Sequence, residues 1–433
     1  MAMPVRFGTD GIRGRAGDAI TLALAYRLGR AVASVFSVPV FVGYDTRESS
    51  PSLAAAVLGG LRDGGATGVN LGYFTTPGVA VIAQQRGGAG VVVSASHNPY
   101  YDNGLKVLGV GGAKLDHATE AAVESALNLA DGPSSLDFDD VAIDDAAERE
   151  YVEHLRELAP TDLSSLSIVV DCANGAASHV AHELFVTTGA RLVMLHDQPD
   201  GRNINEESGS THVESLIDRV REVGADLGLA LDGDADRLIA VDAEGTIRDG
   251  DDLMVLFSLD RLERGVLGGG LVVTSMSNLG LYRALGAAGV EIEETDVGDR
   301  NVVLALEEKS WLLGGEQSGH VIFRDVAPTG DGLLTGLLLA ELIVRRGPLA
   351  EIAGRAWRRV PQELFSVPIE HFNDDEVQEL FGELLVLYSV DRADVRLLVR
   401  PSGTEPLVRI MIEALSAEFV EVFSERLKAL YPS

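Results

Sequence analysis

The sequence predicts an α/β protein of three related mixed α/β domains, each with its sheet between helices, and a smaller, different α+β domain at the C-terminus. Two observations predict this fold class. Residues 38–72, 166–195 and 270–295 each read as a strand, a polar loop, an apolar helix, a glycine-bounded turn and a second strand. Residues 363–433 break that repeat, which indicates a separate final domain.

We place the domains at residues 1–150, 151–250, 251–362 and 363–433. In the last domain, residues 364–388 read as a strand and a helix, and residues 394–415 as two strands around a polar loop before a final helix. In the first three domains the repeat continues through a helix-like stretch to an apolar run and a polar loop: SASHNP (94–99), DGDADR (232–237) and GEQSGH (315–320). Because ligands of such sheets bind beyond the carboxyl ends of the strands, we expect binding at these loops.

Composition narrows the function classes. The 433-residue chain has 66 acidic and 35 basic residues, a net charge of −31, which disfavours nucleic acid or an anionic membrane as partner. Only four of the basic residues are lysines, and this acidic, lysine-poor surface predicts adaptation to high salt, with a GC-rich genome as the alternative explanation. A single cysteine, the lack of a signal-peptide layout and the lack of a bilayer-length apolar run predict a cytoplasmic protein. The sequence leaves the choice between monomer and homodimer open.

The DGDADR loop indicates a metal site. Asp232, Asp234 and Asp236 alternate directly after an apolar strand, and three carboxylates so close repel one another unless a cation lies between them. Oxygen ligands suit Mg²⁺ or Ca²⁺. An EF-hand is excluded, because its glycine and glutamate positions hold Arg237 and Ala243. A solvated acidic turn stays the alternative, although Arg237 suggests an anion nearby.

The SASHNP loop presents Ser96 as a nucleophile or phosphate carrier. It lacks the two glycines of the hydrolase GxSxG elbow. We expect His97 to point away from Ser96, since neighbours on an extended backbone face opposite sides, so it is a poor base for that serine. Lys106 is a candidate proton shuttle, because a lysine whose pKa is lowered by burial can release its proton and an arginine cannot. A capped turn and chance retention of the lysine are the alternatives.

Three further loops carry weaker signals. The stretch RPSGTEPLVR supplies hydroxyls and guanidinium groups that match phosphate geometry, from Arg400, Ser402, Thr404 and Arg409 around Gly403. GEQSGH offers Glu316, Ser318 and His320 beside glycines, and carboxylate and hydroxyl groups suit sugar hydroxyls. FGTDGIRG adds Arg13 in a glycine-rich loop. Each is also compatible with an ordinary glycine-rich turn.

The motifs FGTDGIRG, SASHNP, DGDADR, GGEQSGH and RPSGTEP, in this order and over the whole chain, resemble those of the α-D-phosphohexomutases. Within that family, FGTDGIRG, GRNINEESGSTH and GGEQSGHVIF are most similar to the phosphoglucosamine mutase branch. The resemblance implies an isomerase that interconverts glucosamine 6-phosphate and glucosamine 1-phosphate through a phosphoserine and a 1,6-bisphosphate. Its partners would be small-molecule sugar phosphates.

The resemblance also implies residue roles. Ser96 would carry the phosphoryl group and, with the three aspartates, hold one Mg²⁺ per chain. Lys106 would assist proton transfer, and Arg13 and Arg237 would stabilise phosphoryl charge. Sugar hydroxyls and the non-reacting phosphate would be held by two further sets: Glu316, Ser318 and His320; and Arg400, Ser402, Gly403, Thr404 and Arg409. The alternatives are a phosphomannomutase/phosphoglucomutase or a relaxed-specificity hexomutase, and a catalytically silent sugar-phosphate-binding protein.

Overall fold

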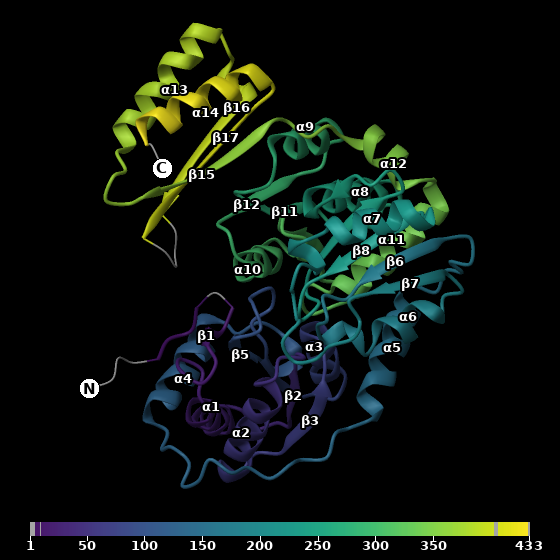
Figure 1. Ribbon diagram of the computed structural model, residues 1–433, viewed down its shortest axis with the longest axis vertical. Coiled ribbons are helices and arrows are strands. Elements are labelled where there is room, and N and C mark those ends of the chain that lie inside the picture. Colours follow the sequence, from purple (N-terminus) through teal and green to yellow (C-terminus); the bar gives the residue numbers. More distant parts are fainter. Residues whose placement is uncertain (1–4, 9, 402–405, 432–433) are drawn as a thin grey trace.

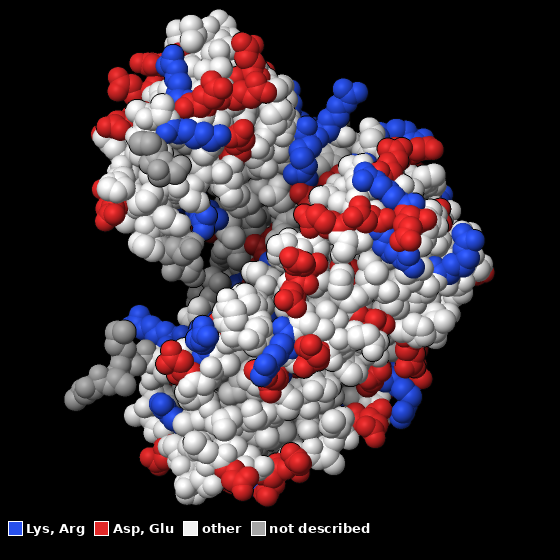
Figure 2. Space-filling view, in the orientation of Figure 1, with Lys and Arg blue, Asp and Glu red and all other residues white. Residues whose placement is uncertain are grey.

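The computed structural model describes residues 5–8, 10–401 and 406–431. Four sheets with their helices follow one another in an arc, so that the C-terminal part lies opposite the N-terminal part (Figure 1). The space-filling view shows the molecule hollowed between these two parts (Figure 2). No helix formed by residues 5–8, 10–401 or 406–431 is long and apolar enough to cross a bilayer.

The first sheet has the strand order β1-β5-β4-β2-β3. Strands β4, β2 and β3 are parallel, and β5 and β1 continue the sheet antiparallel. The central strand β4 is buried at all five positions because both faces of the sheet are covered, which is why its sequence, AGVVV, is apolar throughout. Its elements are β1 (Ile12–Arg15), α1 (Leu22–Val35), β2 (Val40–Tyr44), α2 (Ser50–Asp63), β3 (Gly68–Tyr73), α3 (Thr76–Gln85), β4 (Ala89–Val93), β5 (Asp102–Leu108) and α4 (His117–Leu129).

The second sheet, β10-β9-β8-β6-β7, has the same order of parallel and antiparallel strands as the first. The third, β12-β11-β13-β14, keeps four of those positions. The predicted repeat is therefore confirmed. The elements are α5 (Ala146–Leu158), β6 (Ser167–Asp171), α6 (Ala181–Val186), β7 (Arg191–Leu195), α7 (Glu214–Val223), β8 (Leu227–Leu231), β9 (Leu238–Asp242) and β10 (Ile247–Arg248), then α8 (Gly250–Glu263), β11 (Leu271–Thr274), α9 (Leu279–Ala287), β12 (Ile292–Thr295), α10 (Asp299–Lys309), β13 (Leu313–Gly315), β14 (Val321–Phe323), α11 (Gly332–Arg346) and α12 (Leu349–Ala356).

The second and third sheets share helices. Helix α8 packs against β13 and β14, whereas α11, which follows the third sheet in sequence, packs back on β8 and β9 of the second. The helix allows this close approach at Gly336, where a Cβ would lie 2.9 Å from the Leu229 side chain. One hydrophobic core consequently runs through both sheets and onto one face of the first, and it fixes the relative positions of their loops.

The C-terminal part is a three-stranded antiparallel sheet, β15-β17-β16, covered by two helices. It has a core of its own, in which Val377 and Phe381 of α13 meet Phe419 and Phe423 of α14. Its elements are β15 (Gln362–Pro368), α13 (Asp374–Tyr388), β16 (Val395–Pro401), β17 (Leu407–Ala414) and α14 (Ala417–Leu430). The order strand, helix, two strands and helix is the one that the sequence predicts.

Candidate active site

The loops after β4, β8 and β13 each connect a parallel strand to an antiparallel one. The first carries Ser96, which is fully buried and has a φ of 51°, in the left-handed region that non-glycine residues rarely adopt. Ser96 Oγ donates a hydrogen bond of 2.5 Å to Asp232 Oδ2 in the second loop. Ser94, also buried, accepts a hydrogen bond from the Ser96 backbone N–H through its Oγ. The fold thus brings the two strongest sequence candidates into direct contact.

The expected orientation of His97 is wrong. Its Nδ1 lies 3.1 Å from Ser96 Oγ, because the backbone at Ser96 is left-handed rather than extended and turns both side chains to the same side. Burial, followed by the charges of Arg237 and Arg13, lowers the pKa of His97 to about 4. The ring is therefore neutral at pH 7 and contributes a polar contact to Ser96 without a charge.

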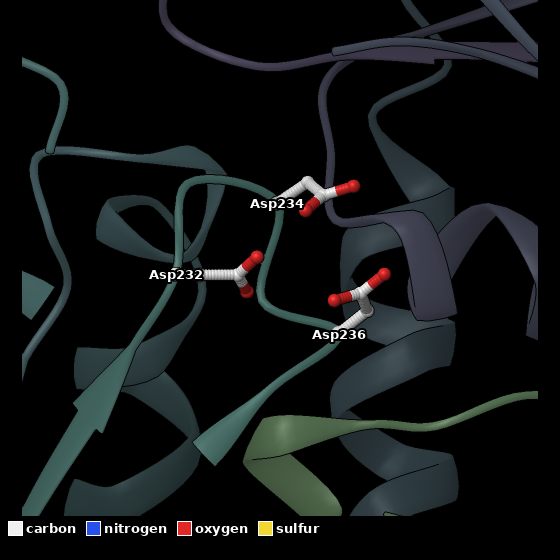
Figure 3. A group of neighbouring side chains, drawn as sticks. All are labelled: Asp232, Asp234 and Asp236. Atoms are coloured by element: carbon white, nitrogen blue, oxygen red, sulfur yellow. The ribbon is translucent and has the colours of Figure 1, made fainter. Parts of the chain in front are cut away.

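The DGDADR loop gathers its three carboxylates in one place (Figure 3). One oxygen from each of Asp232, Asp234 and Asp236 lies within 4.8 Å of the others, and all three residues are buried. Burial, and then the charges of Asp236 and Asp234, raise the pKa of Asp232 well above its ordinary value. Asp234 Oδ1 and Asp236 Oδ1 are buried with no hydrogen-bond partner in the described part of the chain. Buried, unpartnered carboxylate oxygens beside a serine hydroxyl fit a hard divalent cation such as Mg²⁺.

Lys106, on β5, is paired with carboxylates on several sides. Its Nζ lies 2.7 Å from Asp234 Oδ2, 2.8 Å from Asp10 Oδ2 and 3.7 Å from Asp236 Oδ2. Burial alone would lower its pKa, but these three carboxylates raise the pKa well above its usual range. The premise of a burial-lowered lysine pKa is therefore wrong. The relay role of Lys106 remains a prediction.

Two guanidinium groups lie at the edge of this cluster. Arg13, on β1, pairs with Asp10, and Arg237 Nε lies 3.7 Å from Asp236 Oδ1. The Nε atoms of both arginines are buried and have no hydrogen-bond partner among the described residues. Unpartnered N–H groups beside a nucleophile favour an anionic ligand such as a phosphoryl group.

The GEQSGH loop brings two of its three predicted residues into buried positions. Glu316 Oε1 accepts a hydrogen bond of 3.0 Å from the Gly298 backbone N–H. His320 Nδ1 lies 3.7 Å from Asp236 Oδ1, and although burial lowers the pKa of His320, its contact with Asp236 raises it to about 8. Ser318 is exposed. His320 therefore joins the carboxylates of residues 232–237, which we call the metal loop, whereas Glu316 is buried and Ser318 is exposed.

The C-terminal candidates stand apart from this cluster. Arg400 on β16 and Arg409 on β17 are direct partners in the antiparallel register, so their side chains share one face of the sheet. Arg409 donates a hydrogen bond to Ser366 Oγ on β15. The end of β16 and the start of β17 point toward the N-terminal part of the molecule (Figure 1). Ser402, Gly403 and Thr404 lie outside the described residues.

Sequence reasoning missed three residues of the site. Asp10 bridges Lys106 and Lys114, whose Nζ lies 3.1 Å from Asp10 Oδ1. Thr76 binds Asp234 twice: its Oγ1 donates to Asp234 Oδ2 and its backbone N–H donates to the Asp234 carbonyl. Arg47 reaches the Ser96 backbone. Asp10 lies in the motif FGTDGIRG, Thr76 in the TTP that begins α3, and Arg47 in YDTRESS. Their polar side chains are visible in the sequence, but the residues that they bind come from distant segments and are set by the tertiary fold.

The chain matches four family models. They are described as phosphoglucomutase/phosphomannomutase alpha/beta/alpha domains I, II and III and the C-terminal domain, and match residues 4–132, 149–245, 249–360 and 369–429. A phosphoglucosamine mutase of Desulforamulus reducens is 45% identical over 421 residues, 94% of each chain. One of an Exiguobacterium species is 43% identical over 442 residues, covering 97% of this chain and 96% of the relative.

Among solved structures, a phosphoglucomutase/phosphomannomutase family protein from Burkholderia thailandensis has a TM-score of 0.80 at 26% identity. The match covers 100% of this chain and 99% of that one. The four matched domains, the full-length relatives and the order of the loops agree. This chain is an enzyme of the phosphohexomutase group and belongs to the phosphoglucomutase/phosphomannomutase family.

Proposed function

We propose that this chain interconverts glucosamine 6-phosphate and glucosamine 1-phosphate, through a phosphoserine at Ser96 and a 1,6-bisphosphate intermediate. The observation that carries the proposal is the 2.5 Å contact between Ser96 Oγ and Asp232 Oδ2, which sets a nucleophile from the first domain against the carboxylates of the second. The full-length relatives named phosphoglucosamine mutase support the choice of sugar. A binding protein without catalysis needs neither the nucleophile nor the carboxylate cluster.

Each transfer exchanges one phosphorus–oxygen bond for another. A sugar hydroxyl oxygen attacks the phosphorus on Ser96, the bond from phosphorus to Ser96 Oγ breaks, and the proton of the sugar hydroxyl ends on Ser96 Oγ. Lys106, which contacts Asp10 and Asp234, is the candidate to relay this proton. Because its pKa is raised, it is protonated at pH 7, so it would donate a proton to Ser96 Oγ as the bond from phosphorus breaks and take up the proton of the sugar hydroxyl in return. Arg13 and Arg237 stabilise the phosphoryl oxygens. The second transfer runs in reverse from the other end of the bisphosphate.

One Mg²⁺ per chain would be held by Asp232, Asp234 and Asp236 with an oxygen of the phosphoserine, and would supply positive charge to the transferring group. Glu316 and Ser318 would hold sugar hydroxyls, with His320 beside them. Arg400 and Arg409, with the predicted Ser402, Gly403 and Thr404, would hold the phosphate that does not react. Each of the proposed domains, at 1–150, 151–250, 251–362 and 363–433, would thus contribute one of these groups. We also propose that the enzyme acts in the reducing cytoplasm.

The substrate assignment is tested by comparing kcat/KM for glucosamine 6-phosphate, glucose 1-phosphate and mannose 1-phosphate. We expect the amino sugar to be preferred at least about tenfold, or ~1.4 kcal/mol of transition-state discrimination. A preference for either neutral sugar would replace the branch assignment with a phosphomannomutase/phosphoglucomutase. Equal rates would indicate a hexomutase of relaxed specificity.

The phosphoserine is tested by mass spectrometry of the peptide that contains residues 94–99. Ser96→Ala should abolish turnover and remove a phosphate-sized mass increment from this peptide. Ser94→Ala is the matched variant, since Ser94 is equally buried in the same peptide, and it should keep the mass increment on Ser96. A phosphate found on Ser94 would show that Ser94, and not Ser96, carries the phosphoryl group.

A further inference from the structure

The carbonyl oxygen of Ser96 receives two side-chain hydrogen bonds from different domains. Arg47 Nη2, from the loop after β2, donates to it at 2.9 Å, and Asn205 Nδ2, from the second domain, also donates at 2.9 Å. Both nitrogens also lie 2.9 Å from the carbonyl oxygen of Asn98. Arg47 Nη1 donates in addition to the Pro99 carbonyl. Three carbonyls of one short loop are therefore held by two side chains.

Arg47 is built into the first domain before it reaches this loop. It is fully buried, and its Nε donates to Asp45 Oδ2 at 2.8 Å. Asp45 is itself held by the hydroxyl of Ser50, at 2.7 Å. A buried guanidinium group has no water to bind, so its donors must be satisfied by the protein, and here the Ser96 loop satisfies them. Through Arg47 and Asp45, the Ser96 loop is therefore hydrogen-bonded to Ser50, the first residue of α2.

Asn205 binds two of the same carbonyls, those of Ser96 and Asn98, from the second domain. Its backbone is left-handed, with a φ of 60°, and its N–H donates to the Ala173 carbonyl at 2.9 Å. The metal loop packs onto the same point, because a Cβ on Gly233 would lie 2.5 Å from the Ser96 carbonyl oxygen and 3.1 Å from Asn205 Nδ2. The Ser96 carbonyl is thus a junction between the nucleophile loop, the metal loop and the segment that holds Asn205.

We propose that Arg47 and Asn205 are positioning residues that hold the Ser96 loop in its left-handed conformation and so keep Ser96 Oγ aligned with the metal-loop carboxylates. The inference rests on the proposed phosphoserine function of Ser96. A left-handed serine is strained, and such a conformation persists only where surrounding contacts impose it. Ser96 must also give and accept a phosphoryl group in the same geometry, and small misplacements of reacting groups cost large factors in rate.

The experiment compares Asn205→Ala and Asn205→Asp with wild type and with Arg202→Gln as the matched control. Arg202 lies in the same segment and its Nε pairs with Glu48 across the same domain boundary, but in the described part of the chain its side chain makes no hydrogen bond to residues 94–99. Each protein is assayed for kcat and KM with the best of the three sugar phosphates, for its thermal midpoint and for the phosphorylated fraction of Ser96 during turnover.

We expect both Asn205 variants to lose at least about tenfold in kcat with KM within about twofold, because the sugar-binding residues are untouched. Asn205→Asp should lose more than Asn205→Ala, since a carboxylate placed against two carbonyl oxygens repels them. The thermal midpoint should stay close to that of Arg202→Gln, which should keep wild-type kinetics. Arg47→Lys keeps the charge but loses the fork that reaches three carbonyls, and should lose kcat as Asn205→Asp does.

Two results would overturn the inference. One is a kcat for the Asn205 variants equal to that of Arg202→Gln. The other is a loss of kcat that follows the thermal midpoint, which a purely structural role would produce. If Arg47→Lys fails to fold, the Asn205 variants decide the question. Failure of the proposed function is distinguishable, because wild-type enzyme would then show no turnover or no phosphate on Ser96.

Discussion

Lys106 and Asp234 form a buried ion pair in which Lys106 Nζ lies 2.7 Å from Asp234 Oδ2. The pair joins β5 of the first domain to the metal loop of the second. The Lys106 ammonium group contacts three carboxylates at once, from Asp10, Asp234 and Asp236, in a chain whose basic residues are nearly all arginines.

The first prediction tests the role of this lysine. Lys106→Arg keeps the charge but releases no proton, and both Lys106→Arg and Lys106→Met should lose at least about 100-fold in kcat. Lys428→Arg is the control and should behave as wild type. Lys428 is exposed, and its ion pair with Glu363 is long, with 3.8 Å between Nζ and Oε2. A near-wild-type rate for Lys106→Arg would contradict proton relay and leave Lys106 as a fixed charge.

The second prediction concerns the metal loop. Asp234→Asn removes one of three carboxylates and weakens the contacts to Lys106 and Thr76. We expect kcat to fall several hundredfold or more, ~3.5 kcal/mol, and Mg²⁺ binding measured by calorimetry to weaken in parallel. Asp218→Asn, on the exposed side of α7, is the control. Full wild-type activity in EDTA would contradict the three-aspartate site.

The third prediction concerns pH and stability at the start of α8. Burial and the charge of Asp251 raise the pKa of Asp249 from 3.8 to about 7. The folded state therefore binds this proton more tightly than the unfolded state, so the contribution of Asp249 to stability falls as pH rises from about 4 to about 7. Asp249→Asn can still cap the helix but does not ionise.

The variant should therefore gain thermal midpoint relative to wild type by about 2 °C or more at pH 8 and show no gain at pH 4.5. Thermal melts of both proteins across this range provide the measurement. A constant difference between the two proteins at every pH would mean that Asp249 has an ordinary carboxylate pKa.

The fourth prediction follows from the net charge of −31. Acidic side chains are spread over the visible face of the molecule (Figure 2). Self-repulsion should weaken as the Debye length shortens from ~10 Å at 0.1 M salt to ~3 Å at 1 M. The thermal midpoint should therefore rise across a KCl series at fixed Mg²⁺. A flat or falling midpoint would refute salt adaptation and favour genome composition as the cause of the lysine scarcity.

The repeated architecture and the central contact of the site were predictable from sequence. Hydrophobic periodicity marks strands and helices locally, and the loops that carry Ser96 and Asp232 begin where the apolar strands β4 and β8 end. The position of α11 was not predictable, because its sequence is apolar over most of its length and does not indicate which sheet it covers, whereas in the packed core it lies on the second. The pKa of Lys106 and the orientation of His97 also depend on the fold: one is set by carboxylates from distant segments, and the other by a left-handed backbone at Ser96.

The three repeated sheets have a consequence for how this enzyme family can change. The corresponding hairpins of the three sheets differ at their tips: under the proposed roles, one tip carries the phosphoryl group, one the cation and one the sugar. The first two are in contact through Lys106, Thr76 and the Ser96 carbonyl, so a change in one tip is expected to displace the other. The tip at residues 315–320 is also tied to the second domain, through the 3.0 Å hydrogen bond from the Leu238 N–H to the Gly319 carbonyl and the contact of His320 with Asp236, whereas Ser318 is exposed. Under the proposed roles, a new sugar preference with intact phosphoryl transfer is therefore expected from substitution of the exposed Ser318, whereas exchange of the whole tip would also disturb the carboxylate cluster.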